Sequence, residues 1–179
     1  MAEALWDDPR LDGFRIEAYA GRVVVSPPPD GGHAVALTGL MRFLFAHGTP
    51  GGPLEIVQGI GVALPTGDGE YAIPDLSLVD EDFRDHQGPK NLFPARVFHA
   101  VVEITEGNGT DDVEIKPRAY AEAGIPVYVI GDRKNGLVHV FSRPRDGLYQ
   151  SEDDYRPGED FVIPGEPAVK VPVDLLLQD

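Results

Sequence analysis

The stretch VFHAVVEITEGNGTDDVEIKPRAYAEAG, residues 97–124, determines how the rest of the chain can fold. The mostly apolar run VFHAVV is followed by an acid, Glu103, and then by a loop of glycine, asparagine and threonine. Beyond the loop, Asp112, Lys116 and Tyr120 recur every four residues, which is the spacing of one helix face. The stretch therefore predicts a buried strand, a turn and the start of a helix.

A second acid, Asp75, lies at the head of another predicted strand. In the sequence AIPDLSLVD, alternation places Asp75, Ser77 and Val79 on one face and the two leucines on the other. A desolvated carboxylate is costly without a partner, so Asp75 and Glu103 are expected to face a cation or water in a cleft. Hard divalent cations prefer oxygen ligands, and Mg²⁺ often works beside a phosphate substrate. Two strand-borne carboxylates and Lys116 therefore predict a magnesium site.

The order Pro74-Asp75, Glu103 and Lys116 resembles the PD-(D/E)XK nuclease superfamily. Within it, the chain resembles the family called "putative restriction endonuclease", formerly a domain of unknown function. The resemblance extends to the opening IEAYAGRVVVSPPP, to GVALP and VVEIT, and to the run from Asp112 to Asp132, which is its most specific part. It implies an α/β fold with a restriction-endonuclease-like mixed central β-sheet, flanked by helices, and with N-terminal and C-terminal antiparallel hairpins.

The resemblance also assigns roles to individual residues. It implies that Asp75 and Glu103 are catalytic metal ligands, with the backbone carbonyl of Ile104 as a third, and that the cofactor is Mg²⁺ or Mn²⁺. In the superfamily a lysine follows the acid by two positions, where this chain has Thr105. The family places that lysine on the next helix, which makes Lys116 the third catalytic residue. A long side chain can still bring its ammonium group to the same point in space.

Around Lys116, three residues are candidates for a supporting role in the site: Thr105, Asp112 and Tyr120. Pro117 directly follows the lysine, so the helix either begins at Pro117 or bends there, and Lys116 lies near its N-terminus in both cases. Asp112 is more simply interpreted as an N-cap, since an acid there accepts free backbone amides. Tyr120 is more simply interpreted as packing against the sheet.

Two residues nearer the N-terminus are further candidates for a supporting role. Residues 14–25 predict a hairpin with its turn at Ala20-Gly21. Glu17 on its first strand is expected either to face solvent or, as the resemblance suggests, to support the metal site. His33 heads an amphipathic helix predicted over residues 33–47, where a capping or surface role is the alternative to contact with a phosphate.

The remaining elements are predicted from apolar runs and from the residues that interrupt them. The strand–helix–strand order around residues 97–132 predicts a parallel crossover at the centre of the sheet. LVHVF then predicts a hairpin or meander at the sheet edge, and prolines restrict the C-terminal stretch to one or two short edge strands. The polar loop between Asp80 and Pro94 is expected to line the substrate cleft, with Arg84 and Lys90 as phosphate contacts.

Composition limits the class of protein. A length of 179 residues suits a single domain spanning residues 1–179. The absence of cysteine excludes disulfides and thiolate metal sites, and no apolar stretch is long enough to span a membrane. The first residues lack the features of a signal peptide, so a cytoplasmic location is expected. The remaining histidines are scattered without ligand spacing and predict no zinc site.

The function predicted from these observations is that of a metal-dependent endonuclease hydrolysing phosphodiester bonds of nucleic acid, with DNA as the favoured substrate. The net charge of −15 argues for weak or selective rather than broad binding of nucleic acid. A homodimer is expected, because two copies related by a twofold axis can cut two strands.

Two alternatives come from other classes. One is a catalytically silent nuclease-fold module that binds nucleic acid or a protein partner. The other is a glycosidase using Asp75 and Glu103, which a single tryptophan makes unattractive because sugar clefts are lined with aromatic residues.

Overall fold

The computed structural model describes residues 8–105 and 111–178, except for the side chains of residues 111 and 112. Its strands are β1 (Arg15–Tyr19), β2 (Arg22–Ser26), β3 (Glu55–Val57), β4 (Gly61–Ala63), β5 (Tyr71–Ala72), β6 (Leu76–Val79), β7 (Leu92–Pro94), β8 (Phe98–Thr105), β9 (Val127–Asp132), β10 (Leu137–Arg145), β11 (Leu148–Tyr155), β12 (Asp160–Ile163) and β13 (Val169–Pro172). Its α-helices are α2 (Gly31–His47) and α3 (Lys116–Glu122). Shorter helical turns are η1 (Pro9–Leu11), η2 (Phe83–His86), η3 (Pro89–Asn91), η4 (Ala95–Val97), η5 (Asp111–Ile115) and η6 (Val173–Leu175).

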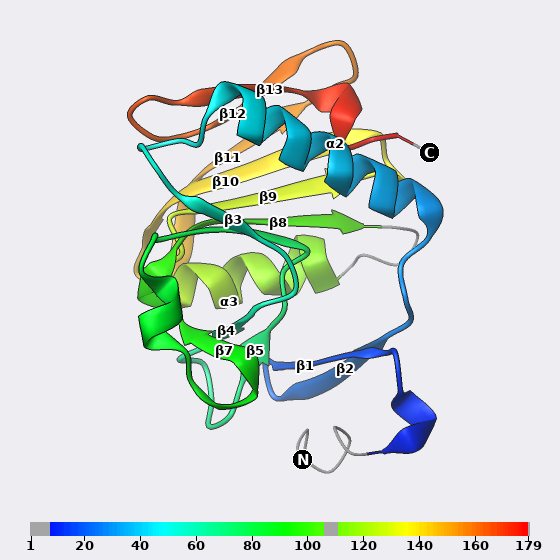
Figure 1. Ribbon diagram of the computed structural model, residues 1–179, viewed down its shortest axis with the longest axis vertical. Coiled ribbons are helices and arrows are strands. Elements are labelled where there is room, and N and C mark those ends of the chain that lie inside the picture. The colour runs from blue at the N-terminus through cyan, green and yellow to red at the C-terminus, as the bar shows by residue number, and fades with distance from the viewer. Residues whose placement is uncertain (1–7, 106–110, 179) are drawn as a thin grey trace.

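The largest sheet has the strand order β11-β10-β9-β8-β6-β3. Its two central strands, β8 and β9, run parallel, whereas every other neighbouring pair is antiparallel. The sheet is therefore mixed, as predicted, and the expected parallel crossover lies at its centre. The two helices lie on opposite faces of this sheet (Figure 1).

Alternation along β8 decides which face each side chain joins. Val102 is buried in the cluster that contains Leu40 of α2, whereas Val101 is buried in the cluster that contains Tyr120 of α3. Side chains two residues apart share a face of a strand. Glu103 therefore lies on the same side of the sheet as α3.

Helix α2 covers the other face and is the longest helix of the described residues. It begins two residues before the predicted position, because the side chain of Asp30 accepts a hydrogen bond from the backbone of His33 and caps the helix. The helix is amphipathic, as predicted: Leu40 and Leu44 are buried, whereas Arg42 faces away from the core, and Phe45 is an exposed apolar residue. Among the described residues, no helix has the length and apolar character needed to cross a membrane.

A second sheet, with the order β2-β1-β5-β4-β7, lies beyond α3 (Figure 1). The hairpin predicted over residues 14–25 is confirmed as β1 and β2. Its turn residues, Ala20 and Gly21, both have positive φ angles. Strand β1 carries two charged side chains, Arg15 and Glu17, into the functional site described below.

The hairpin predicted after β9 is confirmed as β10 and β11 at the edge of the large sheet. The C-terminal strands, however, do not extend that edge, so this prediction is wrong. Strands β12 and β13 pair with each other as a separate two-stranded sheet, and Phe161 and Val171 pack into the same core cluster as α2. Their apolar side chains cover the face of the large sheet instead of its edge, which β11 occupies.

Candidate active site

Sheet register brings the two predicted acids together. Asp75 directly precedes β6 and Glu103 lies in β8, and the antiparallel ladder pairs Leu76 with Val102. The residues next to this pair, Asp75 and Glu103, are therefore neighbours. Both are buried, with exposed fractions of 8% and 1%, so both need compensating partners.

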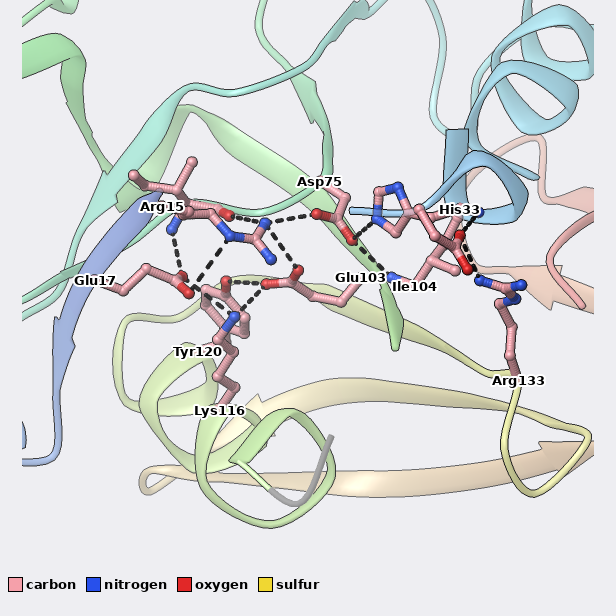
Figure 2. A network of polar contacts seen from close by, with 11 residues as sticks. Arg15, Glu17, His33, Asp75, Glu103, Ile104, Lys116, Tyr120 and Arg133 are labelled. Atoms are coloured by element: carbon pink, nitrogen blue, oxygen red, sulfur yellow. Dashed lines mark hydrogen bonds and ion pairs between the residues drawn. The ribbon is translucent and has the colours of Figure 1, made fainter. Parts of the chain in front are cut away.

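Asp75 is held by three donors (Figure 2). Its Oδ2 lies 2.9 Å from Nε2 of His33 and accepts a 2.8 Å hydrogen bond from the backbone N–H of Ile104. Its Oδ1 accepts a 2.6 Å hydrogen bond from Nη1 of Arg15. Burial alone would raise the pKa of Asp75, but the hydrogen bond from His33 and the charge of Arg15 outweigh burial and lower that pKa to about 2. Asp75 is therefore an anion at neutral pH.

Glu103 is held from the other side by α3. Its Oε1 accepts hydrogen bonds from Nζ of Lys116 at 2.7 Å and from the hydroxyl of Tyr120 at 3.2 Å. Nζ of Lys116 also lies 3.2 Å from Oε1 of Glu17 and 5.6 Å from the centre of the Tyr19 ring. The structure thus brings Lys116 to Glu103, as the resemblance implies, and places Thr105 two residues beyond Glu103 at the end of β8.

The start of α3 explains how Lys116 reaches the site. A π-helical turn, Asp111–Ile115, leads directly into α3, which begins at Lys116. Pro117 therefore lies in the first turn, where its missing N–H has no intrahelical partner to lose. The prediction that Asp112 is the N-cap is wrong, because Asp112 lies within the π-helical turn and Ile115 occupies the N-cap position of α3. The side chain of Asp112 lies outside the described residues.

Tyr120 both packs against the sheet and reaches the site. Its ring makes an edge contact with the ring of Tyr128, with 4.8 Å between the ring centres. Its hydroxyl also donates a hydrogen bond to Glu103, so Tyr120 packs against the sheet and contacts one of the predicted metal ligands. Thr105 is buried at the end of β8, but no hydrogen bond joins its side chain to the site residues that the structure describes.

Glu17 lies inside the site, so the expectation that it faces solvent is wrong. It is 1% exposed, and its Oε1 accepts a 2.8 Å hydrogen bond from the backbone N–H of Ile73 in addition to the contact with Lys116. Glu17 belongs to β1 of the second sheet, which the sequence did not predict as a separate layer, and its side chain faces Lys116 of α3 instead of solvent.

His33 is also buried, with an exposed fraction of 6%, so the surface interpretation is wrong. The helix cap is Asp30 rather than His33, and Nη1 of Arg133 lies 3.1 Å from Oδ1 of Asp30. The capped helix start therefore directs the imidazole at Asp75. A histidine in this position orients the carboxylate, as the outer partners of metal ligands do.

Arg15 is the site residue that the sequence did not reveal. Besides its contact with Asp75, its Nη1 donates to the backbone carbonyl of Ile73 at 3.0 Å and lies 3.8 Å from Oε2 of Glu103. Its Nε lies 3.8 Å from Oε2 of Glu17. Burial alone would lower the pKa of Arg15, but the charges of Glu103, Asp75 and Glu17 raise that pKa further above its ordinary value. The available signal was its spacing from Glu17, because residues i and i+2 of a strand share a face.

Two residues of the loop between Asp80 and Pro94, Arg84 and Lys90, are predicted to contact phosphate, and both lie outside the network around Asp75 and Glu103. Nη1 of Arg84 is 3.9 Å from Oε1 of Glu55. Lys90 lines a pocket with Arg22 and His86, beside the second sheet. Neither Arg84 nor Lys90 is part of the network in Figure 2.

The chemistry of the site suits a hard divalent cation. Three buried acids, Glu17, Asp75 and Glu103, face two bases, Arg15 and Lys116. Carboxylate oxygens, with a nearby backbone carbonyl such as that of Ile104, are the ligands that Mg²⁺ and Mn²⁺ prefer. A guanidinium nitrogen already lies between oxygens of Asp75 and Glu103, which demonstrates that this position stabilises positive charge.

A second group with metal-binding chemistry lies on the edge hairpin of the large sheet. Ligand atoms of His139, Glu152 and Asp154 lie within 4.8 Å of one another. The sequence assigns no ligand role to His139, because its partners come from the opposite strand of the hairpin, where His139 pairs with Asp154. The two acids are exposed, and the imidazole already lies 2.7 Å from Asp154.

Comparisons with known proteins agree with the fold. Residues 5–174 match the model of the Uma2 family, which is described as "Putative restriction endonuclease". The fold is similar to the crystal structure of "a putative nuclease belonging to DUF820" from Anabaena variabilis ATCC 29413, with a TM-score of 0.71 and 14% sequence identity. The similarity covers 98% of this chain and 96% of that chain. No curated protein matches the sequence.

Proposed function

The chain belongs to the Uma2 family, and from this premise we propose that it is a metal-dependent endonuclease that hydrolyses phosphodiester bonds of nucleic acid, with DNA as the favoured substrate. One observation carries this proposal: Asp75 and Glu103 are buried side by side, and the ammonium group of Lys116 lies 2.7 Å from Glu103. Two carboxylates can hold a metal ion and a lysine can stabilise charge that develops on a phosphate, so the three groups suit metal-assisted phosphodiester hydrolysis.

Asp75, Glu103 and the carbonyl of Ile104 would hold Mg²⁺ or Mn²⁺. The bound ion would activate water and neutralise charge that develops on the phosphate. Lys116 contributes a buried ammonium group, which orients the attacking water or stabilises the developing negative charge.

The remaining contacts fix the geometry of the two acids. His33 and the backbone N–H of Ile104 hold Oδ2 of Asp75, while Lys116 and Tyr120 hold Oε1 of Glu103. Each carboxylate thus keeps its second oxygen for the centre of the site. Such preorganisation lowers the cost of binding the ion and of reaching the transition state.

The silent binding module is the second candidate, and the net charge of −15 favours it. A protein with this charge lacks the broad basic surface that usually holds a phosphate backbone. A bound divalent ion would change the local sign of the charge at the site, which is the reason for preferring the endonuclease.

We further propose that the chain acts as a single domain, in the cytoplasm and as a homodimer. Two copies related by a twofold axis would present one site to each strand of a duplex. Sedimentation equilibrium tests the dimer, and a monomer mass at all concentrations would contradict it.

Metal binding separates the two candidates without any substrate. We expect isothermal titration of Mn²⁺ into the protein to show binding that Asp75→Asn weakens by about 100-fold or more, because a neutral amide replaces a ligand. Asp160→Asn, at an exposed acid of β12, is the matched control and should bind like the wild type. Binding that is equal in all three proteins would remove Asp75 from the metal site, and no binding by the wild type would favour the silent module.

A further inference from the structure

We propose that Arg15 is an internal counter-cation, which occupies the metal position in the metal-free protein and must move aside before Mg²⁺ or Mn²⁺ binds. This inference rests on the proposed metal-dependent function. It assigns to Arg15 control over the metal affinity of the site.

The two oxygens of each acid have different tasks. In Asp75, Oδ2 faces His33 and the N–H of Ile104, whereas Oδ1 faces Nη1 of Arg15 at 2.6 Å. In Glu103, Oε1 faces α3, whereas Oε2 lies 3.8 Å from the same nitrogen of Arg15. The oxygens that remain for a metal are thus the ones that Arg15 contacts.

Glu17 repeats the pattern. Its Oε1 faces Lys116 and the N–H of Ile73, and its Oε2 lies 3.8 Å from Nε of Arg15. One oxygen from each of three acids therefore points at a single guanidinium group (Figure 2). A metal ion bound to Asp75 and Glu103 would need the space of that group and would be repelled by its charge.

Arg15 can leave the site, whereas Lys116 cannot easily do so. The side chain of Arg15 is 32% exposed and that of Lys116 is 2% exposed. Arg15 also lines a surface pocket whose wall includes Asp8 and Asp12. Asp8 already pairs with Arg10, so Asp12 is the carboxylate that a displaced guanidinium group would meet there.

Displacement has a measurable consequence for affinity. In the wild type, metal binding must break the contacts of Arg15 with Asp75 and Ile73, and that cost weakens the observed affinity. Arg15→Met keeps an unbranched side chain but removes the charge and the hydrogen bonds. The variant should therefore bind metal more tightly than the wild type.

The test is isothermal titration of Mn²⁺ into the wild type, Arg15→Met and Arg145→Met, with circular dichroism as a check of folding. Arg145 is an exposed arginine paired with an acid on the distant β10–β11 hairpin, so it is the matched control. We expect Arg15→Met to lower the dissociation constant at least tenfold and Arg145→Met to leave it unchanged. Equal or weaker binding by Arg15→Met, beside wild-type binding that Asp75→Asn abolishes, would overturn the inference and leave the metal site intact.

The absence of binding in both the wild type and Arg15→Met would instead overturn the metal site and the inference together. Binding by Arg15→Met alone would support the inference about Arg15, while the lack of binding by the wild type would favour the silent module. A second readout does not depend on the folding of Arg15→Met. It is the NMR signal of the side-chain Nε–H of Arg15 in the wild type, which is assigned by its loss in Arg15→Lys. Saturating Mg²⁺ should shift this signal, and a signal unchanged at saturation would overturn the displacement.

Discussion

Glu103→Gln is expected to abolish nucleic-acid cleavage, lowering its rate on the order of 10³-fold, and to remove metal binding in the same protein. The substitution keeps the shape of the side chain, but it replaces the carboxylate, whose Oε2 lies 3.8 Å from Nη1 of Arg15, with a neutral amide. The charge that would attract the ion is lost. The 2.7 Å hydrogen bond from Lys116 loses its acceptor oxygen, or it keeps an uncharged acceptor and becomes weaker. Cleavage assays and Mn²⁺ titration measure the two effects.

Glu122→Gln on α3 is the matched control for this change. Glu122 pairs with Arg118 on the outer surface of the helix and lies outside the network of the site. The control should retain cleavage and metal binding. Retained cleavage in Glu103→Gln would remove Glu103 from the catalytic site, and lost cleavage with intact metal binding would remove it from the metal ligands.

Lys116→Met is expected to lower the free energy of unfolding by about 3–5 kcal/mol, because it removes the closer of the two cations that face the buried carboxylates of Glu17 and Glu103. Lys116 is 1% exposed and lies 2.7 Å from Glu103 and 3.2 Å from Glu17. Methionine fills much of the same volume, so the loss in the free energy of unfolding comes from the missing charge rather than from a cavity. Denaturant unfolding, with the metal removed by a chelator, measures the change.

Two further variants test the cause of this loss. Lys170→Met, at an exposed position of β13, should change the free energy of unfolding by less than about 0.5 kcal/mol. Adding Glu17→Gln to Lys116→Met should recover part of the loss, since it removes one of the uncompensated charges. A loss below about 1 kcal/mol for Lys116→Met would contradict the assigned charge balance. A double variant whose loss in the free energy of unfolding equals the sum of the losses of the two single variants would contradict it as well.

The central elements of the fold follow from local patterns in the sequence. Apolar runs bounded by turn residues predicted β8 and β9, and the repeat of apolar residues at three and four predicted α2. These signals are strong because each element buries a continuous face in the core. Two short strands carried no such signal: β5 has two residues and β7 has three, and both gain their stability from pairing with distant strands.

The failure to predict the second sheet also explains the wrong expectations at the site. Alternation places Glu17 on one face of β1, but it does not say whether that face meets solvent or another layer. Because the second sheet was not expected, a solvent-facing position remained an alternative for Glu17, as a surface position did for His33, and Arg15 was overlooked. Family-like spacing, rather than surface exposure, identified Asp75, Glu103 and Lys116 as candidates, and the structure places these three residues together and buried.

The most direct test of the proposed function is cleavage of labelled single-stranded DNA, duplex DNA and RNA by the wild type and by Lys116→Ala. Each reaction is run with EDTA, and again after Mg²⁺ or Mn²⁺ is added in excess. We predict cutting by the wild type that EDTA abolishes and added metal restores, with no cutting by the variant. Cutting that persists in EDTA, or the absence of cutting on every substrate with either ion, would contradict a metal-dependent endonuclease.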